Sequence, residues 1–132
     1  MEEIIIADSD VIIDYFNGIG PSAEIIADLI LHHKLGITTI SVFELLAGII
    51  GKKRLAAIEL LLSQATLIPL NAESASKAAG IYTELKKKGR LIGNQDILIA
   101  GICLAYDLPL FTRNFSHFQQ VTHLRLHSPP LC

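Results

Sequence analysis

Short apolar runs alternate with amphipathic segments along the chain. The run "IIIA" at residues 4–7 is apolar at every position, which is typical of a strand buried on both faces of a sheet. Longer segments such as "RLAAIELLLSQA" carry apolar residues at helical spacing and predict helices. The predicted strands are residues 4–7, 35–40, 66–70 and 109–112, with a weaker strand at 123–127. The predicted helices are a short one from about residue 10, then 21–34, 41–48, 54–65, 71–87 and 94–108.

This alternation predicts an α/β fold. Strands that alternate with helices are joined by right-handed crossovers and form a parallel sheet with helices on both faces. No proline-rich or glycine-rich stretch separates the predicted elements, so no linker divides the chain. With 132 residues, one domain is expected.

Residues that favour helix ends mark several of these boundaries. Asp10 is expected to cap the first helix, which leaves Asp8 without a structural role. Ser41 and Glu44 have the spacing of a capping box, in which Glu44 would be a structural partner of the helix start. Asn71 and Asn94 are expected to cap the two later helices.

Polar residues gather where the predicted strands end. In parallel α/β sheets, ligands bind beyond the carboxyl ends of the strands. Asp8 follows the first strand, Glu44 lies in the first turn of the helix after the second, and Asp96 lies in the first turn of the helix before "PLFT". Three more polar residues end or follow "PLFT": Thr112, Arg113 and Asn114. We expect these side chains at one edge of the sheet.

Asp8, Glu44 and Asp96 are candidates for a divalent-metal site. Carboxylates brought together repel one another and resist ionisation, and a hard cation such as Mg²⁺ removes that cost. Such a site can hydrolyse a phosphodiester, because the cation activates water and stabilises the leaving oxygen. The capping box alone would also account for Glu44, and the helix dipole for Asp96. Asp10 and Asp14 are expected to be mainly structural, with Asp10 close enough to reach a second metal.

Charge is unevenly distributed along the chain. The net charge of −2 does not by itself indicate a nucleic-acid-binding protein. Five of the thirteen acids fall within the first fourteen positions, and seven of the eleven basic residues form two clusters. The clusters are Lys52, Lys53 and Arg54, and Lys86, Lys87, Lys88 and Arg90. They are either surfaces for phosphates or solvated helix ends, where cations suit the C-terminal dipole.

Several other classes of protein are disfavoured. The apolar runs are too short for a membrane span, and acids stand near the N-terminus where a signal peptide would carry lysines, so a cytoplasmic protein is expected. Cys103 and Cys132 form no disulfide framework, and both are expected to be free thiols. The chain lacks a glycine-rich phosphate loop, a Gly-x-Ser-x-Gly elbow and a Cys-x-x-Cys pair. His117 is expected to be a turn or packing residue rather than a ligand.

Four stretches together resemble the PIN-domain ribonucleases, specifically the small toxins of the VapC type. They are "IIADSDVIIDYFNG", "TTISVFELLAG", "RLIGNQDILIAGICLAYDLPLFTRNFSHFQQV" and the trailing "LRL", in family order over residues 4–126. The resemblance implies a three-layer α/β/α sandwich with a central parallel sheet, as a single PIN-like domain over residues 1–132. It also implies an endoribonuclease toxin that hydrolyses RNA with Mg²⁺ or Mn²⁺. Such toxins usually form homodimers, and a cognate antitoxin inhibits them by covering the acidic site.

The resemblance also assigns roles to individual residues. The family's acids correspond to Asp8, Glu44 and Asp96, with Asp8 and Asp96 as metal ligands. The place of a fourth family acid holds Asn114, which joins the implied catalytic set, and Asp10 stands where the family usually has Asn or Ser. Either the carboxylate count is preserved in a different layout, or a second metal binds weakly. Two neighbours of Asn114 are expected to contact RNA: Thr112, which matches the family's hydroxyl residue, and Arg113.

Two alternatives remain open at this point. The "DSDV" stretch resembles the Asp-x-Asp pattern of haloacid-dehalogenase-like phosphatases, in which the first Asp is a nucleophile. That family also needs a downstream Lys and a late acidic pair, for which the chain leaves little room. The other alternative is a PIN-like protein that binds RNA or a partner without cutting, and Asn114 is the feature that supports it.

Overall fold

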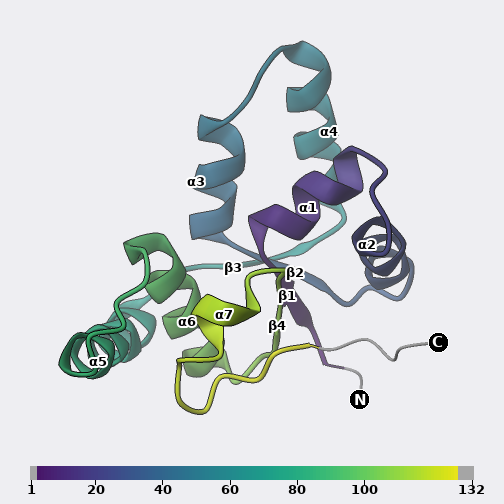
Figure 1. Cartoon of the computed structure of the whole chain (residues 1–132). Helices are drawn as coiled ribbons and strands as arrows, with labels where there is room; N and C mark the ends of the chain where they lie inside the picture. Colours follow the sequence, from purple (N-terminus) through teal and green to yellow (C-terminus); the bar gives the residue numbers. More distant parts are fainter. Residues whose placement is uncertain (1–2, 128–132) are drawn as a thin grey trace.

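A four-stranded parallel sheet lies at the centre of the computed structural model, which describes residues 3–127 (Figure 1). The strand order is β3-β2-β1-β4, so β1 pairs with a neighbour on each side. Ile5 is opposite Leu35 of β2, and Ile6 is opposite Leu110 of β4. The strands are β1 Ile5–Ala7, β2 Leu35–Thr38, β3 Thr66–Ile68 and β4 Leu110–Phe111. The predicted parallel sheet is confirmed.

Helices cover both faces of this sheet (Figure 1). Successive side chains of a strand point to opposite faces, and β1 follows this rule. Ile6 packs into a core with α5, α6 and α7, whereas Ile5 and Ala7 pack into a core with α1 to α4. The predicted three-layer α/β/α sandwich is therefore confirmed. The helices are α1 Ser9–Phe16, α2 Ser22–Leu31, α3 Thr39–Ala47, α4 Lys52–Ser63, α5 Ala72–Lys87, α6 Asn94–Tyr106 and α7 Phe115–Phe118.

The weak strand predicted at residues 123–127 is wrong. Only one isolated parallel bridge forms there, between Leu126 and Leu110. The backbone turns at His123, which has a φ of 69°, and β4 beside it is only two residues long. Few residues therefore run next to β4, and a continuous ladder cannot form.

The starts of α1 and α3 differ from the prediction. Asp8, rather than Asp10, is the N-cap of α1, and its carboxylate accepts from the Ser9 N–H at 2.8 Å. Thr38 caps α3 by accepting from the Ser41 N–H at 3.1 Å, so the predicted Ser41–Glu44 capping box does not exist. In both cases the residue that leaves the strand is still extended, and it caps the helix before the later candidate is reached. Glu44 consequently lies beyond the first turn.

The two later caps differ from each other. Asn71 caps α5 as predicted, with its side chain accepting from the Ser74 N–H at 2.8 Å. The N-cap of α6 is Gly93, and Asn94 is already the first helical residue, so the predicted Asn94 cap is wrong. Gly93 has no side chain that could cap the helix, yet its backbone is extended there, with φ −59° and ψ 150°.

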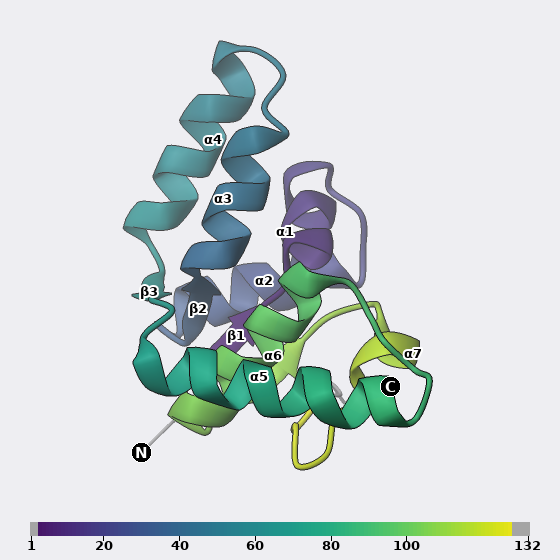
Figure 2. The ribbon, with the colours of Figure 1, turned by 90° about the vertical axis from the view of Figure 1, so that its left-hand side faces the viewer.

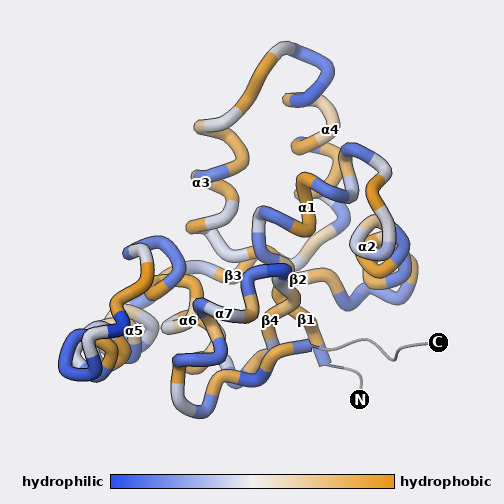
Figure 3. Tube along the Cα trace, in the orientation of Figure 1, coloured by the Kyte–Doolittle hydropathy of each residue, from blue (hydrophilic) through white to orange (hydrophobic). Residues whose placement is uncertain are grey.

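Helices α3 and α4 form a hairpin that extends away from the sheet (Figures 1 and 2). The turn between them carries Ile50, which is 88% exposed. Along the Cα trace, hydrophobic residues fill the strands, and hydrophilic residues gather where β4 ends and α7 begins (Figure 3). The polar edge of the sheet therefore lies at the strand ends, as the sequence predicted.

The helices and the cysteines were also subjects of prediction from the sequence. No helix within residues 3–127 is long and apolar enough to cross a lipid bilayer. Cys103 is a buried free thiol in α6, and burial raises its pKa to about 12. Cys132, also predicted to be free, lies outside the described residues.

Candidate active site

The exits of β1 and β4 are joined by hydrogen bonds through acidic side chains. The Thr112 hydroxyl donates to Asp8 Oδ2 at 2.8 Å and lies 3.4 Å from Asp10 Oδ2. The Arg113 N–H donates to Asp10 Oδ2 at 3.1 Å. Thr112 is fully buried by these contacts, and Asp8 is only 6% exposed. The segment after β4 therefore fixes the orientation of the first two acids.

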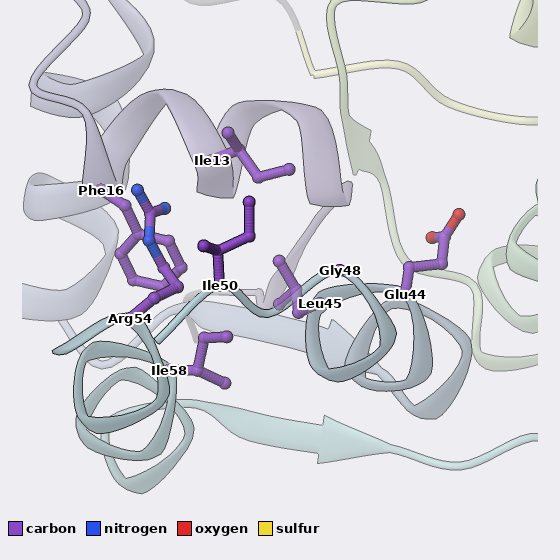
Figure 4. A pocket seen from close by; sticks show the side chains of 8 residues that line it. All are labelled: Ile13, Phe16, Glu44, Leu45, Gly48, Ile50, Arg54 and Ile58. Carbon is purple, nitrogen blue, oxygen red and sulfur yellow. The ribbon is translucent and has the colours of Figure 1, made fainter. Parts of the chain in front are cut away.

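Glu44 reaches the same region from α3. Its Oε1 accepts from the Ser9 hydroxyl at 3.3 Å, one residue after Asp8. Because the capping box is absent, Glu44 makes no hydrogen bond that supports the start of its own helix. Figure 4 shows its carboxylate directed away from the apolar side chains that line the adjacent groove.

Asp96 lies in the first turn of α6, as predicted, and meets the β4–α7 segment. Its Oδ2 is 3.3 Å from Nδ1 of His117, and Nδ2 of Asn114 is 2.7 Å from the same ring nitrogen. His117, expected to be a turn or packing residue, is in fact a neighbour of a candidate metal ligand. Sequence reasoning missed it because nothing local to "NFSHF" indicates a contact with a helix twenty-one residues earlier.

Charge interactions connect Asp8, Asp10, Glu44 and Asp96 into one acidic cluster. Burial, reinforced by the neighbouring Asp10 carboxylate, raises the pKa of Asp8 to about 7. Burial also raises the pKa of Asp10 and of Glu44. The charge of Asp96 acts in the same direction on both Asp8 and Glu44. Neighbouring negative charges thus make Asp8 and Glu44 harder to ionise, and a bound cation would remove that cost.

This donor set fits a hard divalent cation held only in part by protein. Within residues 3–127, no three Asp, Glu, His or Cys side chains lie close enough together to surround a metal ion by themselves. Mg²⁺ does not need such a cage, since it keeps several waters and takes one or two carboxylates plus phosphate oxygens. The charge of Asp96 acts on the Asp8 carboxyl, so the two carboxylates that the sequence predicted as ligands belong to one electrostatic cluster.

Asp14 of α1 and Arg113 after β4 form an ion pair. Asp14, expected to be structural, is buried, and its Oδ2 lies 2.8 Å from Nε of Arg113. The predicted RNA contact Arg113 stays 60% exposed at its side chain. Arg113, from the last third of the chain, therefore pairs with an acid of the N-terminal region.

An apolar groove adjoins Glu44 between α1 and the α3–α4 hairpin (Figure 4). Its lining includes Phe16, Ile50 and Arg54. The Arg54 guanidinium stands 5.0 Å from the centre of the Phe16 ring and donates to Asn17 at 2.9 Å. The acidic site therefore opens at one end onto an exposed apolar surface.

The sequence model of the PIN domain matches residues 5–124, nearly all of the described chain. This chain belongs to the PIN-domain family. The resemblance predicted from the four stretches is confirmed.

Named relatives and solved structures agree with this assignment. Ribonuclease VapC1 of Haemophilus influenzae is 32% identical over 107 residues, which cover 78% of this chain and 80% of that protein. VapBC-1 from nontypeable Haemophilus influenzae superposes with a TM-score of 0.80 at 28% identity, covering 94% of this chain and 96% of that one. VapBC2 from Rickettsia felis, solved bound to a promoter DNA fragment, gives a TM-score of 0.84 at 24% identity, covering 94% and 97%.

Proposed function

We propose that this PIN-domain protein is a metal-dependent endoribonuclease and the toxin of a toxin–antitoxin pair. The observation that carries the proposal is the meeting of Asp8, Asp10, Glu44 and Asp96 at the strand ends, where burial raises the pKa of the first three and repulsion by neighbouring acids raises the pKa of Asp8 and Glu44 further. Relatives over most of the chain are named Ribonuclease VapC.

In this proposal each residue of the site has a separate task. Asp8 and Asp96 hold Mg²⁺ or Mn²⁺, and the Thr112 hydroxyl keeps the Asp8 carboxylate oriented through its 2.8 Å hydrogen bond. When bound, the cation supplies charge stabilisation and a more acidic water. Glu44 would orient the attacking water and act as its proton acceptor, for which its raised pKa is suited.

The substrate is held by cations around the acids. Arg113 is exposed beside Asp10 and Asp14 and binds a phosphate next to the scissile bond. Asn114, in place of a fourth acid, contributes an amide rather than a charge to the catalytic set. The backbone N–H of Asn114 donates to the Thr112 hydroxyl oxygen at 3.1 Å. This bond links Asn114 to the Asp8 side of the site.

The proposed partners are a cognate antitoxin and a second copy of this chain. Solved structures similar to this chain are VapBC toxin–antitoxin complexes. The groove beside Glu44, whose lining includes the exposed Ile50, suits an apolar segment of an antitoxin that would also cover the acids. A toxin of this kind acts in the cytoplasm.

The proposal is tested by incubating the purified protein with total RNA, with and without Mg²⁺ or Mn²⁺, and mapping the cleaved ends. We expect discrete cuts that require the metal, disappear in EDTA and are absent from Asp8→Asn. Full cleavage in excess EDTA would overturn the metal mechanism, and absence of cleavage under every metal condition would overturn the ribonuclease.

A PIN-like protein that binds without cutting is the second candidate. The amide at Asn114 favours it, because the site then has one carboxylate fewer after β4. Metal titration of the wild type against Asp8→Asn, combined with the cleavage assay, separates the two: metal binding without cleavage supports the second candidate. The phosphatase alternative is set aside because the chain belongs to the PIN-domain family.

A further inference from the structure

Ser9 contacts two acids of the site at once. It is the first residue of α1, and its backbone N–H donates to Asp8 Oδ1 at 2.8 Å. Its hydroxyl donates to Glu44 Oε1 on α3 at 3.3 Å. Both Ser9 and Glu44 are half-buried, so water only partly competes for this bond. Ser9 therefore connects the exit of β1 to the acid that α3 supplies.

The Glu44 carboxylate depends on this hydroxyl for its orientation. Within residues 3–127, the Ser9 hydroxyl is the only hydrogen-bond donor to that carboxylate, and no cationic side chain pairs with it. Figure 4 shows the carboxylate directed away from the apolar side chains of the groove, so packing against them does not hold it. Asp8, by contrast, accepts from both the Ser9 N–H and the Thr112 hydroxyl. Removing the Ser9 hydroxyl would release Glu44 and leave Asp8 in place.

The Ser9 hydroxyl has no second structural task. It makes no other hydrogen bond in the part of the chain that the structure describes, and the N-cap of α1 is Asp8. Alanine is the residue that favours a helix most, so it is well tolerated at this helical position. The hydroxyl can therefore be deleted without disturbing the fold.

We propose that Ser9 is a positioning residue for Glu44: its hydroxyl holds Oε1 and leaves Oε2 free to take the proton of the attacking water. This inference rests on the proposed ribonuclease, in which Glu44 is the proton acceptor. Within residues 3–127, Oε2 has no hydrogen-bond partner. A general base must lie within hydrogen-bond reach of the proton that it takes, and fixing one oxygen in advance reduces the freedom lost when the other is aligned.

The proton balance of this step is simple. The O–H bond of the water breaks, its proton passes to Glu44 Oε2, and its oxygen forms the new bond to phosphorus. The bond from phosphorus to the leaving ribose oxygen breaks, and that oxygen takes a proton from solvent. The hydrogen bond from Ser9 also opposes the rise in the Glu44 pKa that burial causes, which favours the ionised form that the step requires.

The experiment compares RNA cleavage by the wild type, Ser9→Ala and Ser9→Thr in saturating Mg²⁺. We expect Ser9→Ala to lower kcat by roughly tenfold or more with KM unchanged, because a hydrogen bond to a charged group is lost. Ser9→Thr keeps a hydroxyl and should recover most of the wild-type kcat. In the Glu44→Gln protein, adding Ser9→Ala should lower kcat no further, since the two residues act as a pair.

A second measurement reads the orientation of Glu44 without any activity. NMR of the metal-free, RNA-free protein, labelled with ¹³C at the glutamate carboxyl carbons, identifies the Glu44 resonance by its absence from Glu44→Gln. At fixed pH, Ser9→Ala should shift this resonance and Ser9→Thr should restore it. Titration calorimetry should give the same Mn²⁺ affinity for the wild type and Ser9→Ala, because Asp8 keeps both of its donors.

Ser63→Ala is the matched control. The Ser63 hydroxyl also donates to one oxygen, that of Leu60 at 2.6 Å, but at the exposed C-terminal end of α4. We expect the control to leave kcat, KM and the Glu44 resonance unchanged. Thermal unfolding confirms that each variant is folded, and Ser9→Gly removes the same hydroxyl should the alanine variant unfold.

The outcomes separate this inference from the proposed function. If the wild type cleaves RNA and Ser9→Ala has the wild-type kcat or an unshifted Glu44 resonance, the role of Ser9 is overturned and the ribonuclease stands. A loss of kcat that recurs in full when Ser9→Ala is added to Glu44→Gln would overturn that role as well. A wild type that cleaves RNA with no metal ion would overturn both.

Discussion

Asp14 and Arg113 form an ion pair that joins the buried face of α1 to the exit of β4. The contact is made by Arg113 Nε, so the two terminal guanidinium nitrogens have no partner among residues 3–127. An arginine held in this way has its planar fork oriented before a phosphate arrives, and less freedom is lost on binding. Asp14 is therefore a positioning residue for the proposed RNA contact.

We predict that Asp14→Ala raises KM for RNA by about three- to tenfold with little change in kcat, because one charge-assisted contact loses its anchor. Arg113→Ala should raise KM by at least as much and also lower stability by about 1–3 kcal/mol, since it leaves the Asp14 charge buried and unpaired. Steady-state kinetics and urea unfolding measure the two effects.

The double variant Asp14→Ala/Arg113→Ala distinguishes positioning from general damage. It should be more stable than Arg113→Ala alone and have the same KM. The exposed pair of Arg125 and Glu3, at 2.9 Å, is the matched control, and removing it should change stability little and leave KM unchanged. Additive effects of the two site substitutions on KM would contradict the positioning role.

Glu44 makes no cap, so its substitution tests function without a structural cost. We predict that Glu44→Gln lowers kcat by about a hundredfold or more while the melting temperature stays the same or rises, because a half-buried carboxylate that resists ionisation has been removed. Cleavage assays and thermal unfolding provide both values. Glu59→Gln, on the exposed side of α4, is the control, and a fully active Glu44→Gln protein would remove Glu44 from the catalytic set.

Asp8 should make stability depend on pH. Its pKa is about 7 in the folded protein against an ordinary value of 3.8, so the folded state binds the proton more tightly. Stability contributed by the protonated form is present below about pH 4 and is lost as pH rises toward 7. Asn at position 8 can still cap α1 but does not ionise, so the variant avoids the loss of stability at high pH. We therefore predict that the Asp8→Asn protein is more stable than the wild type at pH 8, by roughly 1–4 kcal/mol.

Urea unfolding at pH 8 and pH 5 in metal-free buffer checks this prediction. The difference between the two proteins should shrink at pH 5, and saturating Mg²⁺ at pH 8 should stabilise only the wild type. Asp28→Asn, an exposed carboxyl on α2, should show neither effect. Equal stability of wild type and Asp8→Asn at pH 8 would contradict a destabilising buried charge.

The two basic clusters are not equivalent in the structure, although the sequence left the same two interpretations open for both. Lys86 and Lys87 lie in the last turn of α5, where cations suit the helix dipole, and Lys88 pairs with Glu84 at 2.9 Å. Lys52 and Lys53 begin α4, where cations oppose the dipole. The dipole therefore cannot account for the cluster at the start of α4, and phosphate binding is the stronger interpretation of that cluster.

We predict that replacing Lys52 and Lys53 by Gln weakens RNA binding across sequences and flattens its salt dependence by about one unit of slope per lost phosphate contact. The same change at Lys86 and Lys87 should have the smaller effect. Fluorescence anisotropy of labelled RNA with catalytically inactive Asp8→Asn, over roughly 50 to 200 mM salt, measures both slopes. An unchanged slope in both variants would show that the RNA follows another path.

Sequence patterns predicted the sheet and its helices because apolar periodicity reports which face of each element is buried. They failed where two polar residues compete for one role. Thr38 and Ser41 are both good caps, and the choice depends on where the strand stops. The pairs that complete the site, Ser9 with Glu44 and Asp96 with His117, lie far apart along the chain and follow from packing that no local pattern records.

Strand β1 has a neighbour on each side, so the part of the site that follows it resists local opening. The Asp8 N–H donates to Phe111 O at 2.9 Å, and the strand before it is hydrogen-bonded to a neighbour on each side. Amide protons in such a position exchange with solvent only when the whole structure opens, whereas those at exposed turns exchange freely. Deuterium should therefore enter the turn around Ile50 long before it reaches Asp8. A partner that rearranges the α3–α4 hairpin can then do so while the first acid of the site stays in place.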